Sequence, residues 1–105
     1  MKLLEYNLKD WKENKIKRRK KIGDITILLL SIDRTISPPK EGRKNLLCVD
    51  MDDNIIWIAD LPTEMYDSYH DMKFNNGIIL AYSSNSFMAE ISPRTGEILK
   101  KYMVK

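Results

Sequence analysis

The chain has 105 residues, of which 43% are hydrophobic and 31% are charged, with a net charge of +3. This length and composition predict one folded domain with its own core and exclude a disordered chain. The single cysteine, Cys48, excludes an internal disulfide, and its place in an apolar run predicts a buried structural thiol.

Charge is distributed unevenly along the chain. Residues 1–48 hold thirteen Lys and Arg against six Asp and Glu, a net charge of +7, whereas residues 49–105 hold five against nine, a net charge of −4. No Lys or Arg falls between Asn45 and Met72, where seven acids occur. The chain therefore has a basic first half and an acidic middle.

The beginning of the chain combines an ambiguous apolar segment with a basic run. Residues 3–11 fit a strand or a short turn of helix, and the alternation of Leu4, Tyr6 and Leu8 with polar residues favours the strand. Six of the seven residues in 15–21 are basic and could contact the phosphates of a nucleic acid. Because stacking aromatics and a reading helix are not evident, a solvated hairpin end or loop is the favoured interpretation.

The central part of the chain predicts three strands and two loops. The strand 24–32 contains an unbroken apolar run, which predicts burial on both of its faces. Two further strands are joined by a tight turn at Asp52-Asp53. The predicted strands are 24–32, 45–51 and 54–59, and the predicted loops are 33–44, which contains Pro and Gly, and 64–71, which has no clear period.

The stretch 74–99 is the clearest element of the sequence. It contains three short apolar runs separated by Asn, Gly, Ser and Pro, which predicts an antiparallel meander completed by residues 98–104. The loops are too short for a crossover helix, so consecutive strands must be antiparallel neighbours. We expect seven or eight strands in all.

Part of this meander has an echo earlier in the chain. Residues 49–57 align with 91–99 at an offset of 42: each has an apolar strand, an Asp- or Ser-led turn that closes on Asn54 or Gly96 with positive φ, and a second strand. Two ordinary hairpins could be alike by chance, but this spacing is typical of propeller blades. We predict an all-β domain, 1–105, with about two propeller-like blades (a half β-propeller) at about 1–60 and 61–105.

The hairpins LLCVDMDDNIIW (46–57) and FMAEISPRTGEIL (87–99) resemble blades of quinoprotein-type β-propellers. Those propellers hold a cofactor in a central channel, but two blades cannot close a ring, so no cofactor is expected here. A half-propeller of this length also resembles a group of immunity proteins of bacterial contact-dependent growth inhibition. The resemblance implies a cytoplasmic antitoxin whose partner is a cognate RNase A-like toxin domain.

The residue inventory gives no support for catalysis or for a metal site. His70 and Cys48 are the single members of their types and lack an orienting third group, so we expect no enzyme. Zinc needs three or four such ligands. Residues 50–54 are similar to the start of a calcium loop, but Ile55 stands where Gly is needed and Leu61 where Glu is needed.

An inhibitor of a nuclease would act by placing carboxylates and aromatic anchors against an electropositive active site. The expected contacts are Asp52, Asp53, Glu64, Asp67 and Asp71, with Tyr66 and Tyr69 as anchors, for which packing under the loop is an equal alternative. For Trp57, core packing between the blades is favoured over partner contact.

Two alternatives remain at this point. Residues 15–21 with Arg43 and Lys44 could form a basic nucleic-acid-binding module. Exposed edge strands could instead pair with another protein or a copy of the chain, although Lys100, Lys101 and the terminal Lys105 are typical of edge protection. The apolar run 25–32 is too short to span a membrane and no signal peptide is evident, so we expect a cytoplasmic location.

Overall fold

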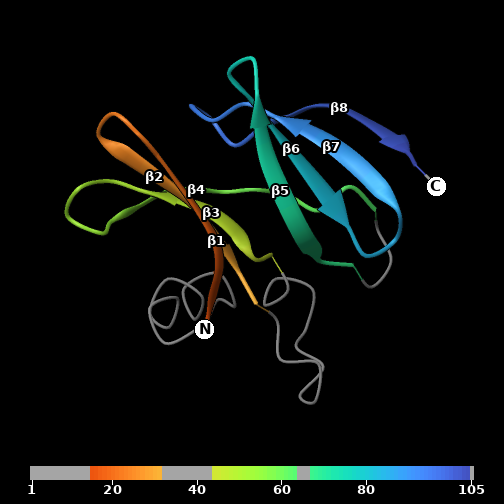
Figure 1. Cartoon of the computed structure of the whole chain (residues 1–105), viewed down its shortest axis with the longest axis horizontal. Helices are drawn as coiled ribbons and strands as arrows, with labels where there is room; N and C mark the ends of the chain where they lie inside the picture. Colours follow the sequence, from red (N-terminus) through yellow and green to blue (C-terminus); the bar gives the residue numbers. More distant parts are fainter. Residues whose placement is uncertain (1–14, 32–43, 64–66, 105) are drawn as a thin grey trace.

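The computed structural model describes residues 15–31, 44–63 and 67–104, which form eight strands and no helix. The strands are β1 (Ile16–Ile22), β2 (Ile25–Leu30), β3 (Leu46–Val49), β4 (Ile55–Ile58), β5 (Tyr69–Asn75), β6 (Ile78–Ser83), β7 (Phe87–Ile91) and β8 (Ile98–Met103). They make two four-stranded antiparallel sheets, β1-β2-β3-β4 and β5-β6-β7-β8, each with its strands in chain order (Figure 1). The predicted all-β fold with two four-stranded units is confirmed.

The two sheets repeat one pairing register. Ile16 pairs with Leu30 in the first sheet, and Tyr69 and Ser83, each 53 residues later, pair in the second. Both hairpins shift register at the next position. The third strands pair alike at an offset of 42 residues, the offset of the sequence echo. The first sheet thus differs chiefly by eleven more residues between its second and third strands.

The sheets stack through non-equivalent faces. Ile27 of β2 shares a buried cluster with Ile79 and Ala81 of β6. By register, however, Ile79 and Ala81 correspond to Thr26 and Leu28, which lie on the opposite face of the first sheet. The two sheets are therefore not related by a two-fold axis, which would bring equivalent faces together.

Strand β2 is buried on both faces, as its unbroken apolar run predicted. Ile27 and Leu29 belong to the cluster between the sheets, whereas Leu28 and Leu30 belong to a second cluster on the other face. Cys48 is 0% exposed and lies in the cluster between the sheets. The expectation of a buried thiol is confirmed.

The turns of the two echoing hairpins are held by equivalent side chains. Asp50 Oδ1 accepts hydrogen bonds of 2.9 Å from the N–H groups two and four residues later. Ser92 Oγ accepts bonds of 3.3 and 3.4 Å from the N–H groups two and three residues later. The positive φ falls on Gly96 (76°) as expected, but on Asp53 (67°) rather than Asn54, because the β3–β4 turn is one residue shorter.

One buried amide joins the two sheets. Asn45 Nδ2 donates to the carbonyl oxygens of Leu30 at 2.7 Å and Tyr69 at 2.6 Å, and Asn45 Oδ1 accepts from the Tyr69 N–H at 2.9 Å. The Tyr69 hydroxyl donates to the carbonyl of Asp60 at 2.7 Å. These bonds satisfy polar groups that burial would otherwise leave unpaired.

Trp57 forms a further contact between the sheets. Its side chain is 8% exposed, and its indole Nε1 donates to the carbonyl of Pro93 at 2.9 Å. The ring lies directly over Gly96 in the β7–β8 turn. Core packing between the sheets, the favoured interpretation for this tryptophan, is confirmed.

Two loop predictions are wrong. The basic run 15–21, expected to be a solvated hairpin end or loop, is exposed as predicted but forms the edge strand β1 of a hairpin, which the sequence could not reveal because both of its faces carry charged residues. Segment 64–71 was expected to be a loop throughout, yet β5 already begins at Tyr69, where a register shift hides the alternation. The predicted strand 3–11 and most of the predicted loop 33–44 lie outside the described residues.

Candidate functional site

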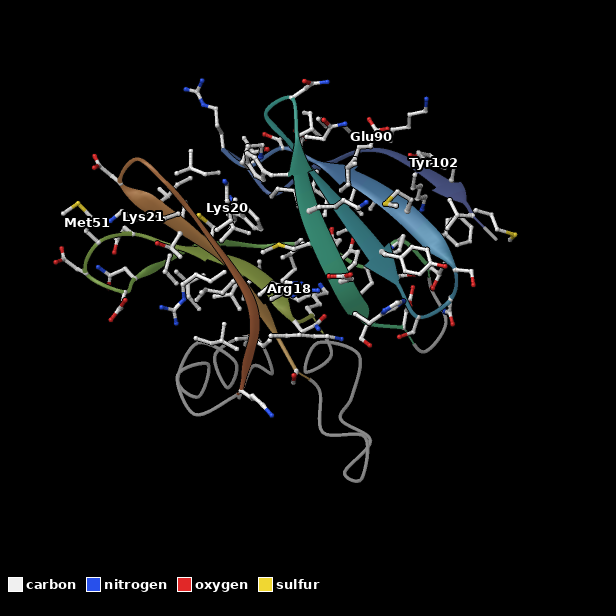
Figure 2. The ribbon with its side chains drawn as sticks, viewed as in Figure 1. Arg18, Lys20, Lys21, Met51, Glu90 and Tyr102 are labelled. Carbon is white, nitrogen blue, oxygen red and sulfur yellow. The ribbon has the colours of Figure 1, made fainter. Side chains whose placement is uncertain are left out.

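The basic side chains of β1 divide between the two faces of the first sheet. Arg18 and Lys20 lie toward the second sheet, where Arg18 pairs with Asp71 and the Lys20 ammonium stands 5.6 Å from the ring centre of Phe74 (Figure 2). Arg19 and Lys21 lie on the opposite face. Because successive side chains of a strand point to opposite faces, the basic residues of β1 are divided between the face toward the second sheet and the face away from it.

The ion pair of Arg18 and Asp71 bridges the edge strands of the two sheets. Arg18 Nε donates to Asp71 Oδ1 at 2.8 Å, with 56% and 47% of the two side chains exposed. The hydrogen bond from Arg18 lowers the pKa of Asp71 from its ordinary value, and the same contact raises the pKa of Arg18. Asp71 is thus half exposed and engaged in an ion pair within the chain.

The β3–β4 turn projects an acidic tip, formed by Met51, Asp52 and Asp53. Met51 is 72% exposed, the largest exposure among the exposed large hydrophobic residues of the described part (Figure 2). Both aspartates are exposed. The Asp50 carboxylate organises the turn, and the hydrogen bond from the Asn54 N–H lowers the pKa of Asp50. The acidic tip therefore presents one apolar and two acidic side chains on a turn whose backbone is held by hydrogen bonds.

The structure does not bring the predicted contact residues together. Asp52 and Asp53 lie at the acidic tip, and Asp71 lies on β5. Tyr69 is 2% exposed, so its predicted role as a surface anchor is wrong and packing is what it does. Glu64 and Tyr66 lie outside the described residues.

Asp67 also requires a correction, because its carboxylate is 0% exposed. Thr63 Oγ1 donates to it at 2.8 Å, and the N–H groups of Ser68 and Asn85 donate at 2.9 and 3.1 Å. Buried carboxylates need such donors to offset the loss of hydration. Asp67 therefore organises the segment between the sheets and is no surface contact.

A cavity of about 500 Å³ lies on the face of the first sheet that points away from the second. We call it the cationic cavity, after the two basic side chains that line it. Its lining residues are Ile16, Arg19, Lys21, Thr26, Leu28, Val49 and Asp53. Leu28 and Val49 are buried, whereas Arg19 and Lys21 are exposed. The positions of Arg19 and Lys21, two apart in a basic run, were the only sequence signal for this site.

The exposed large hydrophobic side chains of the described residues gather along the outermost strands. They are Met51 (72%), Ile56 (48%), Leu99 (54%), Tyr102 (37%) and Met103 (64%), all on β4, on β8 or in the turn before β4. On β8, the Lys101 ammonium donates to the carbonyl of Pro62 at 2.8 Å. Lys100, whose ammonium stands 5.7 Å from the Tyr102 ring centre, and Lys101 are both exposed on this strand, and Lys105 lies outside the described residues.

His70 and Cys48 have unrelated surroundings. The His70 ring packs edge-on against Tyr82, with ring centres 4.7 Å apart. Cys48 lies in the core, where burial, with a smaller contribution from Asp50, raises the pKa of its thiol to about 11. Over the residues described, no group of three or more His, Cys, Asp or Glu could hold a metal ion.

One known protein family matches almost the whole sequence. A family model described as a domain of unknown function (DUF7957) matches residues 12–103. The chain belongs to this family. The match includes all eight strands, so the family domain comprises both sheets. No curated protein matches the chain. Among the described residues there is no helix of the length and apolarity needed to cross a membrane.

Proposed function

We propose that this member of the DUF7957 family is an immunity protein, which binds a cognate toxic ribonuclease domain and blocks its active site. The observation that carries the proposal is the acidic tip, where Met51 is 72% exposed between a turn-forming aspartate and two exposed carboxylates. On this proposal, Met51 supplies an apolar contact for the partner, beside carboxylates that match an electropositive site.

The chemistry of a ribonuclease suits such a tip. A nuclease active site is electropositive because it must bind phosphates, so Asp52 and Asp53 would occupy the phosphate positions. Met51 would fill an adjacent apolar pocket, since the thioether chain adapts to irregular surfaces. The Asp50 hydrogen bonds fix the turn in advance, which reduces the entropy lost on binding.

Inhibition of RNA cleavage tests this proposal. The chain is co-expressed with an RNase A-like toxin domain, and both proteins are purified. The chain should then suppress tRNA cleavage by the toxin domain at a one-to-one ratio. Asp52→Lys should slow association about tenfold and Met51→Ala should speed dissociation, because charge steers encounter and apolar contact holds the complex. Asp24→Lys is the matched control, an exposed aspartate in the β1–β2 turn of the same sheet. Equal effects of Asp52→Lys and Asp24→Lys would remove the acidic tip from the interface.

A second candidate function is favoured by strand β1, whose basic residues Lys17, Arg19 and Lys21 are all exposed. These could contact nucleic-acid phosphates, whereas Lys44 is engaged with Asp60 at 3.0 Å and Arg43 lies outside the described residues. Three contacts to single-stranded RNA predict a slope of about −2 for log affinity against log salt. Fluorescence anisotropy with a labelled RNA measures that slope, and salt-independent or undetectable binding would exclude this function.

A third candidate, pairing of copies through an edge strand, is favoured by the exposure of Leu99 and Met103 on β8. An added strand would pair with the free backbone groups of the edge and cover both side chains. Sedimentation over a hundredfold concentration range should then show a dimer that Leu99→Lys abolishes. A monomer at all concentrations would rule the pairing out.

A further inference from the structure

The cationic cavity occupies the face of the first sheet that is equivalent to the packed face of the second. Its six strand residues correspond by register to Tyr69 (Ile16), Met72 (Arg19), Phe74 (Lys21), Ile79 (Thr26), Ala81 (Leu28) and Ile91 (Val49). All six counterparts belong to the core between the sheets or pack against it. The backbone around the cavity thus corresponds to the surface of the second sheet that is covered by the first sheet.

Trp57, from the first sheet, shows which kind of group packs on the equivalent surface of the second sheet. Trp57 lies over Gly96 in the β7–β8 turn and donates its indole N–H to the carbonyl of Pro93 at 2.9 Å. A flat bicyclic ring therefore packs at this edge of the repeated surface, with its N–H toward the turn. The equivalent turn of the first sheet contains Asp53, which lines the cationic cavity.

The side chains of the cavity differ from their counterparts in polarity. Arg19 and Lys21 replace the apolar Met72 and Phe74, so the β1 side of the cavity is positively charged. Leu28 and Val49, 2% and 3% exposed, keep an apolar floor. A volume of about 500 Å³ lies within the range of small-molecule sites.

We infer that the cationic cavity binds a small planar aromatic anion. The ring would lie in the cavity against the small exposed parts of Leu28 and Val49, and its phosphate or carboxylate would accept hydrogen bonds from Arg19 and Lys21. Thr26, which pairs with Lys21 across the strands, adds a hydroxyl donor on the same face. An N–H group of the ligand, on the ring or on an exocyclic amine, would point to the turn that contains Asp53, as the indole N–H of Trp57 points to its turn.

NMR titration of the labelled full chain tests the site. The probes are adenosine 5′-monophosphate and indole-3-acetate, which distinguish a phosphate from a carboxylate ligand, with adenosine and inorganic phosphate as the separate halves. At least one of the two anions should bind with a Kd below about 1 mM and shift the amide signals of Thr26, Leu28 and Val49. Adenosine and phosphate alone should each bind at least about tenfold more weakly.

Two charge-matched double variants make the test specific to the cavity. Arg19→Gln with Lys21→Gln should weaken binding at least about tenfold. Lys17→Gln with Lys20→Gln removes the same charge from the same strand without removing a residue of the cavity lining, and should change the Kd less than about threefold. The spectra themselves verify that each variant is folded.

Three results would overturn the inference. They are no shift at the cavity amides up to about 10 mM of either anion, equal affinity for adenosine and its monophosphate, and equal weakening by the two double variants. A single-stranded RNA that binds far more tightly than the monophosphate and responds equally to both double variants would mark β1 as a general phosphate-binding strand instead.

Discussion

Replacement of Gly96 by alanine probes the contact between Trp57 and the β7–β8 turn, one of those that hold the two sheets together. The residue has a φ of +76°, and a Cβ atom there would lie 2.5 Å from Cδ2 and 2.6 Å from Cε3 of Trp57. Gly77 is the matched control, because its φ is +78° and a Cβ atom would meet nothing within 4 Å. The two substitutions share the backbone strain and differ in the collision with the indole.

The magnitudes follow from these two terms. A left-handed conformation costs an alanine about 1–2 kcal/mol, which is the whole expected effect at Gly77. Overpacking adds about 1–3 kcal/mol at Gly96, because Trp57 is a rigid ring held by its bond to Pro93 and has little room to move. We therefore expect Gly96→Ala to lower the free energy of unfolding by about 2–5 kcal/mol.

Urea denaturation measures both variants and a double-mutant cycle with Trp57→Ala. In the Trp57→Ala background, Gly96→Ala should cost only the backbone strain, about 1–2 kcal/mol. Equal losses for Gly96→Ala and Gly77→Ala in the wild-type background would refute the packing of Trp57 over the turn. An unchanged effect of Gly96→Ala after removal of the indole would refute it independently.

Three further predictions concern other contacts. Asn45→Ala should lower the free energy of unfolding by about 2–4 kcal/mol in urea denaturation, since the buried N–H and carbonyl of Tyr69 lose their partner, and a loss below about 0.5 kcal/mol would contradict that bridge. The pKa of Asp71 is lowered in the fold, so the contribution of Asp71 to stability is complete above the ordinary carboxyl pKa of about 3.9 and is lost as the pH falls through the lowered value. Carboxyl NMR titration should show that the pKa of Asp71 rises in Arg18→Gln. If the pKa of Asp71 does not rise, Arg18 is not the cause of its lowering. Cys48, with a pKa of about 11 and no exposure, should react with a thiol reagent at pH 8 only after urea unfolding, whereas rapid reaction of the native chain would show an open core.

Local features of the chain could be predicted from the sequence because they depend on residues that are neighbours in the sequence. The meander over 74–99 and the Asp- or Ser-led turns are set by short apolar runs and by side chains that bond to their own backbone. The two-sided burial of β2 follows from its composition alone. Among the candidate site residues, the exposed turn position of Asp52 and Asp53 was predictable in this way, because an exposed hairpin turn is a local property.

Tertiary structure decided the features that depend on residues far apart. Asp67 and Tyr69 look like surface residues in sequence, and only the donors and packing brought to them across the fold bury them. Strand β1 is a strand because β2 offers it a backbone edge, which no hydrophobic pattern within 15–21 records. Nor does composition show which face of each sheet meets the other.

The amino-acid sequence is sufficient to predict that the chain forms all-β hairpins with a repeated turn. The stacking of non-equivalent faces, and with it the separation of Arg18 from Arg19 and the position of the cationic cavity, was decided only when the two sheets packed. The physical reason is that hairpin pairing is governed by local backbone geometry, whereas the choice of packed face depends on the sum of apolar contacts made over the whole surface.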